Sequence, residues 1–237
     1  MCNSLARKLK NLGVGQSEQV NEFVQLVKRK RRIRHGEDIV KIGRPERVLT
    51  VLLRGVACRY KTMENGRRQI FTVQYPGDFC DYHRHFLPQR DVAVAALTDC
   101  VIGVILRDEV EEIAARHPQI SLALWRNTML EVSIFRERLL SVVHRPALER
   151  IASLLCEHIV RLEAIGIDDD IIPLTQIALA DATGLSAVHV NRTIQDLREV
   201  GALSKRSHGL QVVSRDELLR IAKFDARYLD MRQMSSD

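Results

Sequence analysis

The sequence of 237 residues is 46% hydrophobic and 28% charged, which is typical of an ordinary globular protein with room for two domains. It contains no run of 18 uncharged apolar residues and no export signal, so we expect neither a membrane-spanning nor an exported protein. The formal net charge is +6, yet residues 1–34 carry nine Lys or Arg against two acids, so bulk charge does not locate a nucleic-acid-binding face.

The first part of the chain has the pattern of a small β-domain that follows a short helical segment. Asn65-Gly66 is the strongest hairpin signal, because both central residues of such a turn need positive φ. The basic run at 28–32 is interpreted as a solvated surface, with a second nucleic-acid contact as the alternative. Short β-branched runs predict an antiparallel barrel or roll, with strands at 47–54, 56–61, 69–75, 92–97 and 101–106.

Two helices are predicted next. Acidic residues from Asp108 onward mark the start of the first, near its positive end. Pro118 can open the second, which is expected from about Gln119 to Val143 because no Gly or Pro interrupts it. A coiled-coil spacing along this helix predicts a homodimer interface, with packing against its own domain as the alternative. The seam is broken only by Arg136 and consists of Leu122, Trp125, Met129, Val132, Leu139 and Val143.

A third helix begins at a joint formed by His144, Arg145 and Pro146. Proline at a first-turn position can start the helix, which is expected to run to about Ala164 and to close at Gly166. The three aspartates at 168–170 are interpreted as a solvated loop, because adjacent carboxylates lack the alternating spacing of a calcium-binding loop.

Residues 174–203 have the features of a helix-turn-helix. Thr175 can cap a short first helix, in which Ile177, Ala178 and Leu179 are expected to face inward. Gly184 then supplies the permissive backbone conformation that the sharp turn requires.

The second helix of this motif is capped by Ser186, and its buried stripe is predicted to be Val190, Ile194 and Leu197. Its remaining face is therefore available for contact with DNA.

Three residues on that face are the predicted readers of bases: Val188, His189 and Arg192. A guanidinium can bind both acceptors of a guanine, an arrangement worth about 1–3 kcal/mol of discrimination. Ser186 and Thr193 are expected at phosphates, which position the protein without specifying sequence. The complete predicted DNA-binding set is Thr175, Ser186, Val188, His189, Asn191, Arg192, Thr193, Lys205 and Arg206.

A β-hairpin wing is predicted at 203–213, around a turn at 207–209. Over 186–215, five basic residues including Arg215 outnumber two acids, which is the local surplus that phosphate contact needs. The alternative is a winged module that is used only for protein contacts.

A β-rich N-terminal part, a long dimer-type helix and a C-terminal winged helix-turn-helix, in this order, resemble the Crp/Fnr family over nearly the whole chain. Asn65-Gly66 and the run from Pro76 to Phe79 look like turns of the family's roll, and Ser186 to Arg192 aligns with its recognition helix. The resemblance implies an α+β fold and a homodimer on a palindromic operator, which regulates transcription by contacting RNA polymerase or by blocking it. The implied parts are a helical segment with a cyclic-nucleotide-binding-like roll at 1–107, a dimerisation region at 108–144 and a DNA-binding domain at 145–237.

Departures from the family bear on the effector. Cyclic-AMP-binding members hold the ribose and phosphate with Gly-Glu and Arg-Ser pairs. The matching places here are Asp81-Tyr82 and Arg90-Asp91, so we do not expect cyclic AMP, and these four residues are kept as candidates for another effector. Only Cys2 lies where oxygen-sensing members have a cysteine cluster, so no iron–sulfur cluster is expected. Because Val188 replaces a family glutamate, the operator should differ at that position.

The five cysteines are scattered, which suits a reducing cytoplasm better than a disulfide framework. Cys80, His83 and His85 are residue types that ligate haem or another metal, but their spacing is not that of haem-binding members. They are interpreted as structural residues, with a Cys80–Cys100 redox pair as a further alternative. The cofactor is left unassigned.

The sequence thus predicts a bacterial transcription regulator without enzymatic activity, because it shows no nucleophile elbow, phosphate loop or paired carboxylates. The alternative from another class is a β-roll sensor of a small ligand or of redox state, whose output is protein–protein contact.

Overall fold

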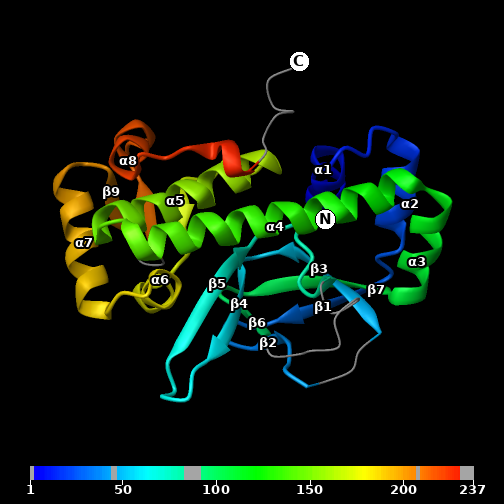
Figure 1. Ribbon diagram of the computed structural model, residues 1–237, viewed down its shortest axis with the longest axis horizontal. Helices are drawn as coiled ribbons and strands as arrows, with labels where there is room; N and C mark the ends of the chain where they lie inside the picture. Colours follow the sequence, from blue (N-terminus) through cyan, green and yellow to red (C-terminus); the bar gives the residue numbers. More distant parts are fainter. Residues whose placement is uncertain (1–2, 44–46, 83–91, 207–208, 230–237) are drawn as a thin grey trace.

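One long helix connects a strand-rich half of the molecule to a helical half. The computed structural model describes residues 3–43, 47–82, 92–206 and 209–229. Its α-helices are α1 (Asn3–Asn11), α2 (Ser17–Gln25), α3 (Arg107–Arg116), α4 (Pro118–His144), α5 (Ala147–Ala164), α6 (Gln176–Thr183), α7 (Ala187–Glu199) and α8 (Arg215–Ala222). Figure 1 shows α4 crossing the molecule, with strands β1 to β7, between residues 29 and 106, on one side of it, α1 to α3 at one end and α6 to α8 at the other. The predicted α+β class is confirmed.

The strand-rich half is an antiparallel roll of two sheets. Their orders are β1-β7-β3 and β2-β6-β4-β5. Apolar residues of both sheets, including Leu52, Val94 and Ile102, form a shared core between them. The strands are β1 (Arg29–Ile33), β2 (Asp38–Val40), β3 (Val48–Arg54), β4 (Ala57–Thr62), β5 (Arg68–Gln74), β6 (Ala93–Ala96) and β7 (Cys100–Leu106).

Strands β1 and β2 were not expected from the sequence. The basic run forms β1, whose backbone pairs with β7 from Arg29 opposite Val104 to Ile33 opposite Cys100. Strand pairing uses backbone groups, so four consecutive cations can join a sheet while their side chains remain exposed. The prediction of an exposed surface holds, but the surface lies on an edge strand.

The chain turns between β4 and β5 at Asn65-Gly66 as predicted, but only Gly66 has the positive φ that was expected of both residues. Gly66 has a φ of +77°, and the carboxamide oxygen of Asn65 accepts a hydrogen bond from the Arg67 amide at 3.0 Å. The Met63 amide donates to the Arg67 carbonyl at 2.8 Å and closes the hairpin.

Helix α4 begins and ends within one residue of the prediction, and its two faces differ. One face packs on the protein's own core through Ile120, Leu124 and Ile134, which are at most 2% exposed. The other face leaves the predicted seam in solvent, with 61% of Trp125 and 66% of Leu139 exposed. The helix therefore packs on its own domain and still presents an unpartnered apolar seam.

The C-terminal half adds a small antiparallel sheet to the helices. Its strands are β8 (Ile171–Ile172), β9 (Leu203–Arg206) and β10 (Gly209–Val212), in the order β8-β10-β9, followed by the 3₁₀ helix η2 (Ala226–Leu229). The predicted wing is present as β9 and β10, and its turn at 207–208 lies outside the described residues. The two-residue strand β8 was too short to give a sequence signal.

The two halves meet in one of the hydrophobic clusters of the molecule. Ile70 and Tyr75 of the roll pack with Ile151 and Leu155 of α5 in a single buried cluster. Across the same boundary, Arg68 pairs with Asp181 of α6 at 2.8 Å. No helix in the described part of the chain is long and apolar enough to cross a membrane.

Candidate nucleic-acid interface

The first helix of the motif, α6, is held by its predicted cap. The hydroxyl of Thr175 accepts a hydrogen bond from the Ala178 amide at 3.1 Å, and Ala178 and Leu179 are buried. The prediction for Ile177 is wrong, because 66% of this residue is exposed. The inward stripe of the short helix runs through positions 178, 179 and 182, which leaves Ile177 on the outer face.

The turn between the two helices depends on Gly184. Its φ is +70°, and the next helix begins where the Ser186 hydroxyl accepts a hydrogen bond from the His189 amide at 3.2 Å. A Cβ at position 184 would meet only Val142, at 3.9 Å. Space is therefore available, and the backbone conformation alone requires glycine.

We expect Gly184→Ala to lower the free energy of unfolding by about 1–2 kcal/mol, the strain of placing a side chain in the left-handed region. Urea unfolding followed by circular dichroism measures this change. The matched control is Gly15→Ala, since Gly15 has no positive φ and no atom within 4 Å of an added Cβ. Equal stability of the two variants would contradict the role given to the turn.

The recognition helix α7 separates a buried stripe from an exposed one. Val190, Ile194 and Leu197 are at most 4% exposed, as predicted, whereas 81% of Val188 is exposed. The other predicted DNA-binding residues of this segment that lie in solvent are Ser186, His189, Asn191 and Arg192.

Thr193 does not belong to this surface. Only 3% of it is exposed, because it lies one position before Ile194 on the side of α7 that packs inward. Its predicted phosphate contact is therefore withdrawn.

A hollow separates α6, α7 and the wing strands. Its volume is about 230 Å³, and its polar lining includes Thr175, Gln176, Asn191, Arg198, Lys205 and Arg206. We call it the wing hollow. Gln176 donates a hydrogen bond to the Asn191 side-chain oxygen at 3.4 Å, across the gap between α6 and α7. Sequence reasoning missed Gln176. It counted Arg198 only in the local basic surplus, although Arg198 follows Asn191 by seven residues, a spacing that places both on one helix face.

Arg215 cannot supply the phosphate contact that its charge suggested. Its guanidinium pairs with Asp168 and Asp170, each at 2.7 Å, and also with Glu163. The acidic loop thus binds an arginine of α8, and Asp168 is still largely exposed, as a solvated loop requires. No group of three or more metal-binding side chains occurs among the residues that the structure describes.

Two of the four candidate effector residues, Asp81 and Tyr82, make contacts that hold the roll together. The carboxylate of Asp81 accepts hydrogen bonds from the Thr50 amide at 2.8 Å and the Thr50 hydroxyl at 2.9 Å, so it ties the turn to β3. Half-buried Tyr82 packs against Phe79. Arg90 and Asp91 lie outside the described residues.

The candidate ligand Cys80 is completely buried. Burial, together with the nearby charge of Asp81, raises the pKa of this thiol well above its usual value, which favours its protonated form. Cys100 is also a buried free thiol. His83 and His85 lie outside the described residues.

A buried ion pair that sequence reasoning missed connects the roll to α4. Arg59 of β4 donates to both carboxylate oxygens of Glu131, at 2.6 and 3.1 Å, and to the carbonyls of Phe79 and Cys80. Glu131 also accepts from Asn127. Every side of this guanidinium therefore has a partner.

A second missed cluster centres on Asp78. Its carboxylate pairs with Lys8 of α1 at 2.9 Å and with Arg161 of α5 at 2.6 Å. Burial alone would raise the pKa of Asp78, but the two positive charges outweigh it and lower the pKa to about 2. Two cavities beside these ion pairs measure about 60 and 10 Å³. Both are much smaller than the roughly 300–1,000 Å³ of a typical ligand site.

Comparison with known proteins agrees with this arrangement. A family model described as a cyclic nucleotide-binding domain matches residues 30–117, and one described as a Crp-like helix-turn-helix domain matches 149–221. The chain is 28% identical over 214 residues to a probable transcriptional activator of Rhizobium leguminosarum bv. viciae, covering 89% of this chain and 86% of that protein. It is 28% identical over 194 residues to the transcriptional activator protein FnrL of Cereibacter sphaeroides, covering 79% of this chain and 77% of FnrL.

A solved structure shares most of this architecture. FixK2 from Bradyrhizobium japonicum superimposes with a TM-score of 0.72 at 25% identity, covering 84% of this chain and 98% of that one. A cyclic-nucleotide-binding-type roll, a long helix and a winged helix-turn-helix together define a DNA-binding transcription regulator. The chain belongs to the Crp/Fnr family of these regulators.

Proposed function

We propose that this regulator binds a two-fold-symmetric operator as a homodimer, with α7 of each protomer in the major groove. The observation that carries the proposal is the pair of surfaces left in solvent, the apolar seam of α4 and the polar stripe of α7. A long helix with such a seam needs a partner, and a two-fold dimer presents two recognition helices to a palindrome.

We also propose a division of the chain into three functional parts. Residues 1–107 form the sensor part, 108–144 the dimerisation part and 145–237 the DNA-binding part. Of the two relatives named above, one is described as a probable transcriptional activator and the other as a transcriptional activator, which favours activation through contact with RNA polymerase in the bacterial cytoplasm. The proposal requires no catalytic activity.

The proposed roles on α7 follow from exposure and chemistry. Arg192 and His189 can hydrogen-bond base edges, and Val188 can contact only an apolar group such as a thymine methyl. Ser186 caps the start of the helix, and Lys205 and Arg206 are exposed in the wing, which supports a role for all three at phosphates.

Selection of binding sites from a random duplex pool, followed by anisotropy titrations, tests the proposal. The pool should yield a palindrome with half-sites about one helical turn apart. We expect Arg192→Ala to bind this operator at least about tenfold more weakly and to relax preference at one base pair of each half-site, because the bidentate contact is lost.

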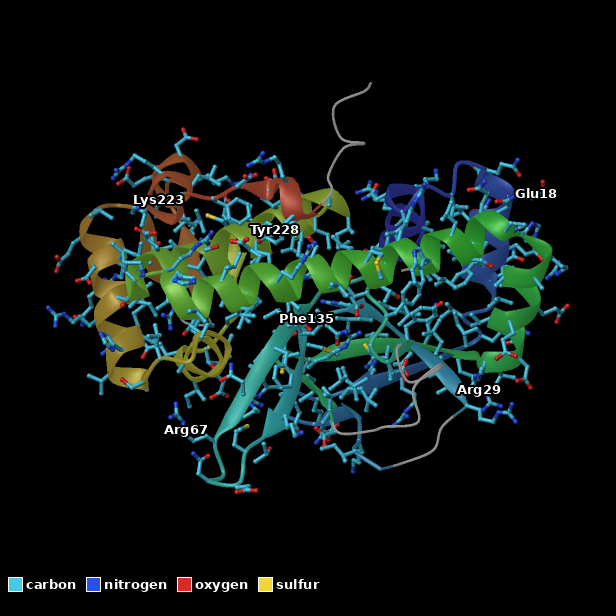
Figure 2. All side chains as sticks on the ribbon, in the orientation of Figure 1. Glu18, Arg29, Arg67, Phe135, Lys223 and Tyr228 are labelled. Carbon is cyan, nitrogen blue, oxygen red and sulfur yellow. The ribbon has the colours of Figure 1, made fainter. Side chains whose placement is uncertain are left out.

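The control is Arg29→Ala, which removes an exposed cation at the end of the roll away from α7, as Figure 2 shows, and should bind as wild type does. An enriched pool without a palindrome, or equal binding by Arg192→Ala, would count against the proposal.

A further inference from the structure

The wing hollow carries a positive charge. Lys205 and Arg206, whose phosphate contacts are proposed above, contribute to it, and Arg198 adds a cation that has no assigned contact. Three cations line it, Arg198, Lys205 and Arg206, and no carboxylate occurs among its lining residues. Within the described part of the chain, Arg198 and Lys205 have no ion-pair partner, and Arg206 donates only to the neutral side chain of Gln211 at 2.9 Å. Unpaired cations around a concave site attract an anion.

The hollow lies directly beside the surface that is proposed to read bases. Asn191, Gln195 and Arg198 follow one another at spacings of four and three on α7, so they form one stripe. Val188 and Arg192 form the adjacent stripe. A duplex that places its bases against the second stripe brings a strand of its backbone toward the first.

The size and the polar groups of the hollow suit one anionic group. Its volume of about 230 Å³ is below the roughly 300–1,000 Å³ of a site that encloses a whole ligand. The start of α6 contributes the positive end of a helix dipole, and Gln176, which donates to Asn191, adds a neutral amide. Guanidinium and ammonium groups are the usual partners of phosphate oxygens.

We propose that the wing hollow is a binding site for one phosphate of the operator backbone, with Arg198 as its principal ligand and Lys205 as the second. This inference rests on the proposed DNA-binding function and extends it to residues on the distal half of α7. The contact carries no base information, so it strengthens binding to every duplex and sets part of its salt dependence.

The first test compares Arg198→Gln with wild type on the selected operator and on an unrelated duplex of equal length. We expect about tenfold weaker binding to both duplexes and a fall of about one in the slope of log affinity against log salt concentration. Arg29→Gln is the matched control, because it removes one exposed arginine charge far from the hollow and should change neither quantity. Arg198 is exposed, so circular dichroism should show an unchanged fold.

The second test replaces single phosphates of the operator with neutral methylphosphonates. One linkage in each half-site should weaken wild-type binding about tenfold and should have no further effect on Arg198→Gln, because the same contact is removed from either side. Inorganic phosphate added at constant ionic strength should compete only weakly, because it makes none of the other contacts of the duplex.

Each contrary result has a distinct meaning. Wild-type binding by Arg198→Gln, while Arg192→Ala loses the operator, would overturn the phosphate site and leave the proposed function intact. Wild-type affinity for every methylphosphonate-substituted operator, while inorganic phosphate alone binds the hollow, would overturn the assignment to the DNA backbone. Failure of the wild-type protein to bind either duplex would overturn the proposed function itself.

Discussion

Val132→Asp is expected to raise the dissociation constant of the dimer at least about a hundredfold. The side chain is 45% exposed in the single chain and lies in the middle of the α4 seam, between Met129 and Leu139. Burying such a side chain is worth about 1.5–3 kcal/mol, and a two-fold dimer loses two copies at once while bringing two carboxylates together. A loss of about 3 kcal/mol corresponds to roughly two orders of magnitude in affinity.

Sedimentation equilibrium over a range of protein concentrations measures this change, and operator affinity should fall with it. Met63→Asp is the matched control, because Met63 is 52% exposed on the β4–β5 hairpin and not on α4. The complementary variant Arg136→Leu should tighten the dimer, since it replaces the one charge that interrupts the seam. A monomeric wild-type protein, or a Val132→Asp protein that dimerises normally, would contradict the proposed interface.

Local patterns in the sequence were sufficient to predict much of the fold. The Asn65-Gly66 turn, the limits of α4 and the two caps at Thr175 and Ser186 each depend on neighbours within a few residues. The helix-turn-helix could be predicted for the same reason, because its turn requires Gly184 at a fixed place between two short helices.

Long-range pairing could not be predicted in the same way. Arg59 and Glu131 are 72 residues apart, and Asp78 and Arg161 are 83 residues apart, so no spacing rule connects them. The predicted phosphate contact of Arg215 is wrong for the same reason, because the sequence does not show which acidic residues pair with it. Ile177 was a different error, since a helix of eight residues is too short for its apolar pattern to define the inward face.

Asp78→Asn is expected to lower the free energy of unfolding by about 3 kcal/mol at neutral pH. The substitution leaves Arg161 and Lys8 without the carboxylate that neutralises them, and breaking a buried pair from one side typically costs about 3–5 kcal/mol. The lower end applies because Arg161 keeps Glu157, at 3.3 Å, as a partner. Urea unfolding at pH 7 measures the difference, with Glu64→Gln on the exposed hairpin as a control that should be neutral.

The same variant should change how stability depends on acid. The pKa of Asp78 is about 2 in the folded protein and near 3.9 when the chain is unfolded, so its contribution of about 2 kcal/mol is complete above about pH 5 and is lost as the pH falls toward 2. Asparagine does not titrate. The stability gap between wild type and Asp78→Asn should therefore narrow by about 1 kcal/mol between pH 7 and pH 3. A gap that stays constant or widens in acid would show that the Asp78 carboxylate does not stabilise the contact between the roll and α5.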